Sequence, residues 1–122
     1  MNIPDDLKYT RDHEWINKDG KVGITDYAQE SLGDVVFVEL PQVGEQLKIG
    51  EAFGVVESVK SVSDLYSPVD GTVKAVNESL KETPELINQE PYNQGWIMQV
   101  DILNQSSDLL DAKGYRQQVE GE

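Results

Sequence analysis

The sequence contains no cysteine and a single histidine, His13. The lack of cysteine excludes disulfide bonds, thiolate metal ligands and a cysteine nucleophile. One histidine without cysteine cannot anchor a typical zinc site, where several nitrogen or sulfur ligands converge. We therefore expect His13 to pack or to form a hydrogen bond near Trp15 rather than to do chemistry.

Basic residues are scarce as well. Ten Lys and Arg stand against 23 Asp and Glu, which gives a formal net charge of -13. Such a surface repels phosphate backbones and anionic lipid, so we expect neither nucleic acid nor membrane as a partner. No apolar run approaches the ~20 residues of a membrane span. The start, "MNIPDDLKYT", has no signal or transit pattern, which predicts a cytoplasmic protein of bacterial type.

Catalytic and nucleotide-binding motifs are also absent. The chain has no G-x-G-x-x-G, no Walker-type loop and no G-x-S-x-G. Paired carboxylates are common in so acidic a chain, and no pair stands out as acid and base. The sequence therefore predicts no self-sufficient active site.

Short β-branched segments separated by Pro and Gly are what the chain does contain, and 122 residues suit one domain. Pro68–Gly71 predicts a turn, and Asp19-Gly20 predicts a hairpin turn. The pattern indicates an all-β sandwich or flattened barrel with a few peripheral helices. The expected strands are two within residues 8–24, and then 34–41, 51–59, 61–68, 72–78 and 95–102.

Three short helices are expected around these strands. Thr25 is placed to cap the first and Gly33 to end it. Thr83 as N-cap and Pro84 at the first helical position predict the second. A C-terminal helix is expected at about residues 106–118, broken or frayed near Gly114.

A lysine, Lys60, stands at the tip of the hairpin predicted at about residues 51–68. The tip, "SVKSV", has no Gly, Asn or Pro, although turn chemistry favours them. Local departures from such rules concentrate at functional sites. An ordinary solvated lysine is the alternative, but a rigid exposed amine also suits an amide-linked prosthetic group.

Four stretches of the sequence, the one around Lys60 included, resemble a known family, that of the glycine cleavage system H protein. The stretch "GVVESVKSVSDLYSPVDGTV" resembles its lipoyl-attachment region. Three other stretches are similar to the family in the same order: "YTRDHEW", "GITDYAQESLGDVVFVELPQVG" and "NQEPYNQGWIMQV". The resemblance covers roughly Lys8 to Tyr115.

The resemblance implies a single lipoyl-carrier domain over residues 1–122, with a lipoyl/biotinyl-domain-like sandwich of two antiparallel sheets (a barrel-sandwich hybrid) and a C-terminal helix. It implies a non-catalytic carrier with lipoate on Lys60 Nζ. The carrier would take the aminomethyl group of glycine from a pyridoxal-phosphate glycine decarboxylase to a tetrahydrofolate-dependent aminomethyltransferase. Electrons would pass to dihydrolipoyl dehydrogenase, and a lipoate-attaching enzyme would modify the lysine.

The resemblance also assigns further site residues. Glu57 and Gly71, the latter in a turn facing the hairpin, match positions read by the attaching enzyme. Glu14 and Asp64 match acids that line the cleft for the loaded arm. This chain departs from the family at two positions near that cleft. Asp12 and Ser31 stand where better-known members carry a serine and a histidine.

Other tasks remain possible on the same fold. The protein could be a lipoyl-relay donor for 2-oxoacid dehydrogenase complexes. A biotinyl carrier is less consistent with the residues, because methionines usually flank a biotinylated lysine and here Val59 and Ser61 do. A degenerate interaction module without cofactor is the last alternative. A monomer is expected, since no unusual apolar stripe is evident.

Overall fold

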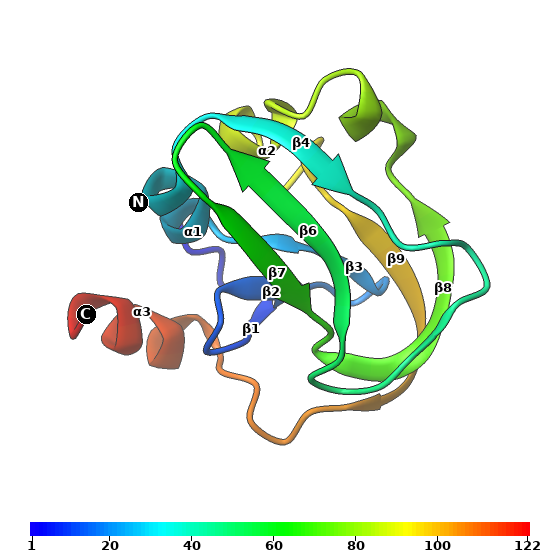
Figure 1. Ribbon diagram of the computed structural model, residues 1–122. Coiled ribbons are helices and arrows are strands. Elements are labelled where there is room, and N and C mark those ends of the chain that lie inside the picture. The colour runs from blue at the N-terminus through cyan, green and yellow to red at the C-terminus, as the bar shows by residue number, and fades with distance from the viewer.

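The computed structural model describes residues 1–122 as two antiparallel sheets with short helices at their edges (Figure 1). The larger sheet has six strands in the order β1-β2-β3-β9-β8-β5, and the smaller has three in the order β4-β6-β7. The strands are β1 Lys8–Tyr9, β2 Glu14–Ile16, β3 Lys21–Ile24, β4 Val35–Glu39, β5 Gln46–Leu47, β6 Ala52–Ser58, β7 Val62–Tyr66, β8 Val69–Val76 and β9 Met98–Gln105.

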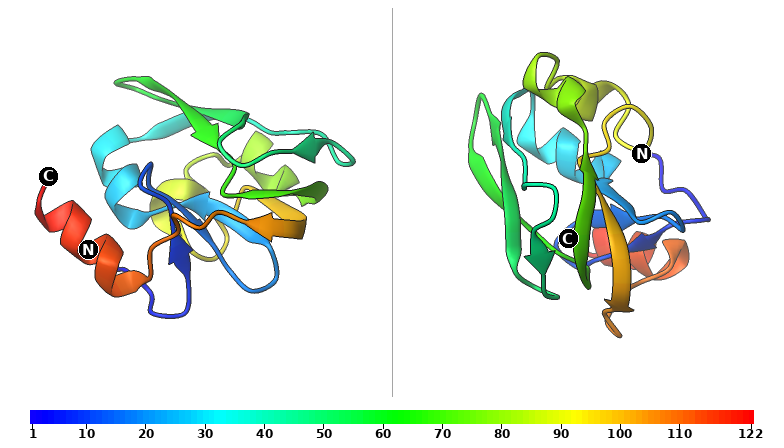
Figure 2. Two further views of the ribbon diagram at one scale, coloured as in Figure 1. Left: turned by 90° about the horizontal axis from the view of Figure 1, so that it is seen from below. Right: turned by 90° about the vertical axis from the view of Figure 1, so that its right-hand side faces the viewer.

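The two sheets face each other as layers, which is plain in the right-hand view of Figure 2. Between them lies a core of 16 buried residues, with Val56 and Leu65 from the smaller sheet and Val22, Val73 and Val100 from the larger. Burying such side chains contributes roughly 1.5–3 kcal/mol each. The predicted sandwich of two antiparallel sheets is confirmed, and it is not a closed barrel.

A second, smaller core joins the C-terminal helix α3 (Ala112–Glu120) to the first strands. Tyr9 and Tyr115 stack with ring centroids 4.7 Å apart, and Trp15 is buried beside them. The main chain of Tyr9 also exchanges hydrogen bonds with Leu110, just before the helix. These contacts fix α3 against β1 and β2.

Helix α1 (Asp26–Leu32) forms as its caps predict. The Thr25 hydroxyl accepts a hydrogen bond from Ala28 N at 3.1 Å, and Gly33 ends the helix with φ of 80°. The predicted Asp19-Gly20 turn is also present, with φ of 84° at Gly20.

The prediction of Thr83 as a helix cap is wrong. After the 3-10 helix η1 (Glu78–Lys81), helix α2 spans only Leu86–Gln89 and has no side-chain cap. Leu86 N and Ile87 N bond to the main-chain carbonyls of Thr83 and Pro84. A tight main-chain turn thus satisfies the donors that the threonine hydroxyl was expected to meet.

The C-terminal helix starts later than predicted. Residues 106–110 form a loop, and α3 begins after Asp111, whose Oδ1 accepts from Gly114 N at 2.8 Å. The loop lets Leu110 pair with Tyr9, an interaction that a helix from residue 106 would prevent. The helix continues through Gly114 without a break.

The predicted turn at Pro68–Gly71 is wrong too. Here the chain leaves the smaller sheet and enters the larger one, and β8 already begins at Val69. A register shift between Asp70 and Gly71 bends the strand. Gly71 therefore lies within a sheet, paired with Ile102 and Leu47. None of the helices is long and apolar enough to cross a membrane.

Candidate functional site

Lys60 lies at the tip of the β6–β7 hairpin, in a turn that a serine holds together. Ser58 N donates to Ser61 O at 2.8 Å, while Ser58 Oγ accepts from Lys60 N at 3.2 Å and from Ser61 N at 3.1 Å. Because this hydroxyl satisfies the turn's donors, neither Val59 nor Lys60 needs a positive φ. This is the physical reason that the tip does without Gly or Asn.

The tip is also fixed to the neighbouring strand. Val59 N donates to Asp34 O at 3.0 Å, just before β4. The Lys60 side chain is exposed and forms no ion pair, and its methylenes pass over Gly33, where a Cβ would lie 3.1 Å from Cε. The lysine amine is thus free at the end of a well-held turn.

A cleft of about 390 Å³ begins beside the lysine, at Ser61, and runs between α1, β7 and the loop that leads into β2. It brings together Glu14, Asp64, Asp12 and Ser31, which lie far apart in the sequence. The full lining is Asp12, His13, Glu14, Ile24, Tyr27, Ala28, Ser31, Leu32, Ser61, Ser63, Asp64 and Leu65. The lining therefore combines apolar side chains with three carboxylates.

Glu14 is the buried acid of this cleft, with only 2% of its surface exposed. Thr10 Oγ1 donates to its Oε1 at 2.6 Å, and Tyr66 N, on the free edge of β7, donates to its Oε2 at 3.2 Å. Burial raises the pKa of Glu14 to about 7, although both hydrogen bonds oppose that rise. A cation placed in the cleft would favour the ionised carboxylate. Asp64, by contrast, is exposed and pairs with Val55 across β6 and β7.

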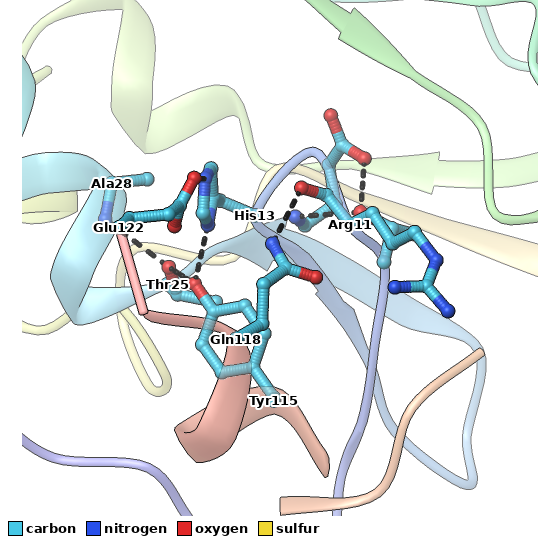
Figure 3. A network of polar contacts seen from close by, with 9 residues as sticks. Arg11, His13, Thr25, Ala28, Tyr115, Gln118 and Glu122 are labelled. Atoms are coloured by element: carbon cyan, nitrogen blue, oxygen red, sulfur yellow. Dashed lines mark hydrogen bonds and ion pairs between the residues drawn. The ribbon is translucent and has the colours of Figure 1, made fainter. Parts of the chain in front are cut away.

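His13 is the cleft residue whose contacts the sequence did not indicate. Its Nδ1 lies 2.7 Å from Tyr115 Oη, which is in turn 2.7 Å from Thr25 Oγ1, and its Nε2 lies 3.6 Å from Glu122 Oε1 (Figure 3). His13 therefore forms its hydrogen bond with the C-terminal helix and not with a group near Trp15. No local signal could have found a contact between residues 102 positions apart.

The remaining predicted residues, Glu57 and Gly71, lie in different sheets. Glu57 is exposed on β6, near the tip, between Phe37 of β4 and Val62 of β7. Gly71 lies within β8, which follows the hairpin in the sequence, and is not in a turn facing it. A Cβ at Gly71 would lie 2.6 Å from Val100 Cγ1, so close packing of β8 on β9 explains the glycine. No group of three His, Asp or Glu side chains converges to hold a metal ion.

A single exposed lysine on a fixed hairpin tip of a two-sheet sandwich defines a carrier domain, and the comparisons identify which kind. The family described as "Glycine cleavage H-protein" matches residues 7–122, so the chain belongs to this family of non-catalytic carrier subunits. The glycine cleavage system H protein of Deinococcus deserti is 54% identical over 119 residues, which are 98% of this chain and 99% of that protein. The one from Rubrobacter xylanophilus is 56% identical over 123 residues, 98% and 97% of the two chains.

A solved structure agrees with the sequence comparisons. The crystal structure of a glycine cleavage system H protein from Mycobacterium marinum superimposes with a TM-score of 0.91 at 44% identity. The match covers 97% of this chain and 99% of that one. The likeness thus extends over the whole sandwich, α3 included.

Proposed function

We propose that this protein is the lipoyl carrier of a glycine cleavage system, with lipoate joined by an amide to Lys60 Nζ. The observation that carries the proposal is the free amine of Lys60 on a turn fixed by Ser58 and Asp34, beside a cleft whose lining includes a buried acid. Family membership supports the same conclusion.

The residues around Lys60 fit a lipoyl arm. The apolar residues that line the cleft, among them Tyr27, Leu32 and Leu65, offer contact to methylene groups, and three carboxylates line it as well. When bound, the lipoyl dithiolane supplies the sulfurs that accept and release the aminomethyl group and the electrons, so a chain without cysteine can take part in thiol chemistry. The rigid tip keeps the attachment point fixed while the arm moves between partners.

Glu14 is proposed to pair with a cationic group carried into the cleft. An ammonium beside a buried carboxylate forms a charge-assisted hydrogen bond that is strong because water is excluded. Thr10 and Tyr66 hold the two carboxylate oxygens in place. Asp64, at the cleft margin, is proposed to add to the negative potential. We assign no role to Asp12 or Ser31, although both line the cleft.

The attaching enzyme is proposed to recognise the hairpin through Glu57, which is exposed on the same strand as the turn. Gly71 is proposed to contribute indirectly, by allowing β8 to pack closely beyond the hairpin base. The partners proposed for the loaded carrier are glycine decarboxylase, the aminomethyltransferase and dihydrolipoyl dehydrogenase. A monomeric, cytoplasmic protein remains a prediction.

The first test is the intact mass of the protein after incubation with lipoate, ATP and a lipoate ligase, followed by fragmentation. We expect one lipoyl adduct, on Lys60, and none on the Lys60→Arg variant, which keeps the charge and the fold. The lipoylated protein should then support glycine–bicarbonate exchange by a purified glycine decarboxylase. An adduct elsewhere, or exchange undiminished in the variant, would refute the proposal. Transfer of the lipoyl group to an apo acyltransferase domain would instead favour the relay donor.

A further inference from the structure

Glu14 lines two cavities, and the cleft is only one of them. The second cavity, of about 190 Å³, lies where the chain leaves β7, and it shares Asp12 and Glu14 with the cleft. Thr10 and Tyr66, which hold the two carboxylate oxygens of Glu14, both line this second cavity, and neither lines the cleft. We call it the rear cavity. Besides the two shared acids, its polar lining consists of Thr10, Arg11, Tyr66, Ser67, Ser106 and Asp108.

The Thr10 hydroxyl forms two hydrogen bonds, and both are with Glu14. Its Oγ1 accepts from Glu14 N at 3.0 Å and donates to Glu14 Oε1 at 2.6 Å. In the ionised state the hydroxyl proton therefore points at the carboxylate. In the protonated state Tyr66 N still donates to Oε2, so the proton lies on Oε1 and points at Thr10 Oγ1. The hydroxyl proton of Thr10 must then turn away from the carboxyl group.

The rear cavity gives that proton a place to go. Its volume of about 190 Å³ is far larger than the ~15 Å³ that one water molecule needs. Ser67, Ser106 and Asp108 supply polar partners for water there. Thr10 is half-buried, whereas Glu14 is only 2% exposed. The hydroxyl thus stands between a buried carboxyl group and a space that water can enter.

The proposed role of Glu14 makes such a path necessary. Burial raises the pKa of Glu14 to about 7, so near neutral pH the empty cleft contains the protonated acid in much of the population. A cation that enters the cleft pairs with the carboxylate, and the proton of Glu14 must then leave. An arm in the cleft covers the acid on that side, which leaves the rear cavity as the other opening beside it.

Other titratable and charged groups surround Glu14 on both sides. Asp12 lines both cavities, Arg11, Tyr66 and Asp108 line the rear cavity, and His13, Tyr27 and Asp64 line the cleft. Burial is the main cause of the raised pKa of Glu14, and the charge of Asp12 adds a smaller rise. A signal from the Glu14 carboxyl group itself is therefore needed to follow its proton.

We propose that Thr10 is the residue through which Glu14 exchanges its proton with water in the rear cavity. The O–H bond at Glu14 Oε1 breaks and its proton passes to Thr10 Oγ1, while the hydroxyl proton of Thr10 passes to water or a buffer base in the rear cavity. The products are a carboxylate, a neutral hydroxyl that donates to it and a protonated base, with no change in oxidation state. The inference rests on the proposed pairing of Glu14 with a cation, which requires the proton to leave while the cleft is occupied.

The test measures proton exchange at Glu14 in the unmodified protein by carboxyl ¹³C relaxation dispersion, which reports microsecond-to-millisecond events. The signal is assigned by its loss in Glu14→Gln. The rate constant for protonation is taken at each protein's own midpoint pH, so a shifted midpoint alone does not change it. Thr10→Val keeps the shape of threonine and removes the hydroxyl, and it should lower this rate constant at least about fivefold. Thr10→Ser should stay within twofold of the wild type. A hydroxyl that only positions the carboxylate would move the midpoint and leave the rate constant unchanged.

Two matched variants compare the openings. Ser106→Phe narrows the rear cavity and should slow protonation at least about threefold, whereas Ser31→Phe narrows the cleft and should stay within twofold of the wild type. Thr83→Val is the control for loss of a threonine hydroxyl, since only the main chain of Thr83 forms hydrogen bonds. Thr10→Ala replaces Thr10→Val should that variant fail to fold, which near-UV circular dichroism reports.

Three results would overturn the inference. They are an unchanged rate constant in Thr10→Val, a stronger effect of Ser31→Phe than of Ser106→Phe, and a wild-type Glu14 that stays ionised from pH 4.5 to 8.5. If any of these occurs in a chain that is lipoylated on Lys60 and supports glycine–bicarbonate exchange, only the proton path fails. If the wild type is not lipoylated, the proposed function fails, whatever the exchange rate at Glu14.

Discussion

Replacing Glu14 by glutamine tests the central electrostatic feature of the cleft. The pKa of Glu14 is raised from its ordinary value of 4.5 to about 7, chiefly because burial penalises the charged carboxylate. Glutamine has the shape of the protonated acid and cannot ionise. Its carbonyl oxygen can still accept from Tyr66 N, and its amide can donate to Thr10 Oγ1.

The sign of the effect follows from proton binding. Between pH 4.5 and about 7 the unfolded chain has released the Glu14 proton and the folded protein has kept it, so the free energy of unfolding falls as the pH rises. Each pH unit in this window corresponds to about 1.4 kcal/mol, so the ionised carboxylate costs the folded protein about 3 kcal/mol by pH 8. Glu14→Gln should therefore match the wild type near pH 4.5 and exceed its stability by up to about 3 kcal/mol above pH 7.

Urea unfolding of both proteins at several pH values from 4.5 to 8.5 provides the measurement. Subtracting the two free energies of unfolding at each pH cancels the contribution from the titration of the other acids. Glu120→Gln, at an exposed position on α3, is the matched control and should leave the pH profile unchanged. A variant less stable than the wild type above pH 7 would show that the hydrogen bonds from Thr10 and Tyr66 outweigh the penalty of burial.

Two further predictions concern the turn and the C-terminal helix. Ser58→Ala removes the hydroxyl that accepts from Lys60 N and Ser61 N, so it should cost about 1 kcal/mol and speed hydrogen exchange of both amides; unchanged exchange by NMR would argue that the main chain alone holds the turn. Tyr115→Phe removes the hydroxyl between His13 and Thr25 and should lower stability by about 1–3 kcal/mol in urea unfolding at pH 7. A loss of only a few tenths of a kcal/mol would mean that stacking, and not this hydroxyl, fixes α3.

Much of the fold and one part of the site could be predicted from local signals. The Thr25 and Gly33 caps and the Asp19-Gly20 turn formed as expected, because each depends on the conformation of a few adjacent residues. Lys60 stands out as a candidate in the sequence because its turn departs from local rules, and the hydrogen bonds to Ser58 Oγ explain that departure.

Local signals failed where distant segments compete for the same backbone. Thr83 lost its capping role to a main-chain turn, and the segment before α3 stayed unwound because Leu110 pairs with Tyr9. Pro68–Gly71 looks like a turn in sequence, but it is a corner between two sheets. In each case the residue that decides the backbone conformation lies outside the few neighbouring positions to which a local propensity refers.

The sequence by itself indicated most of the sandwich's strands, though neither the separate β1 nor β5, together with the hairpin and the lysine at its tip. It could do so because strand patterns and turns arise from neighbouring residues. Only the tertiary structure decided that Glu14 is buried with a raised pKa, that His13 contacts Tyr115, and that Phe37 faces solvent next to Glu57. Desolvation and strand register depend on what packs against a residue from elsewhere in the chain, and the order of amino acids does not reveal that until the layers come together.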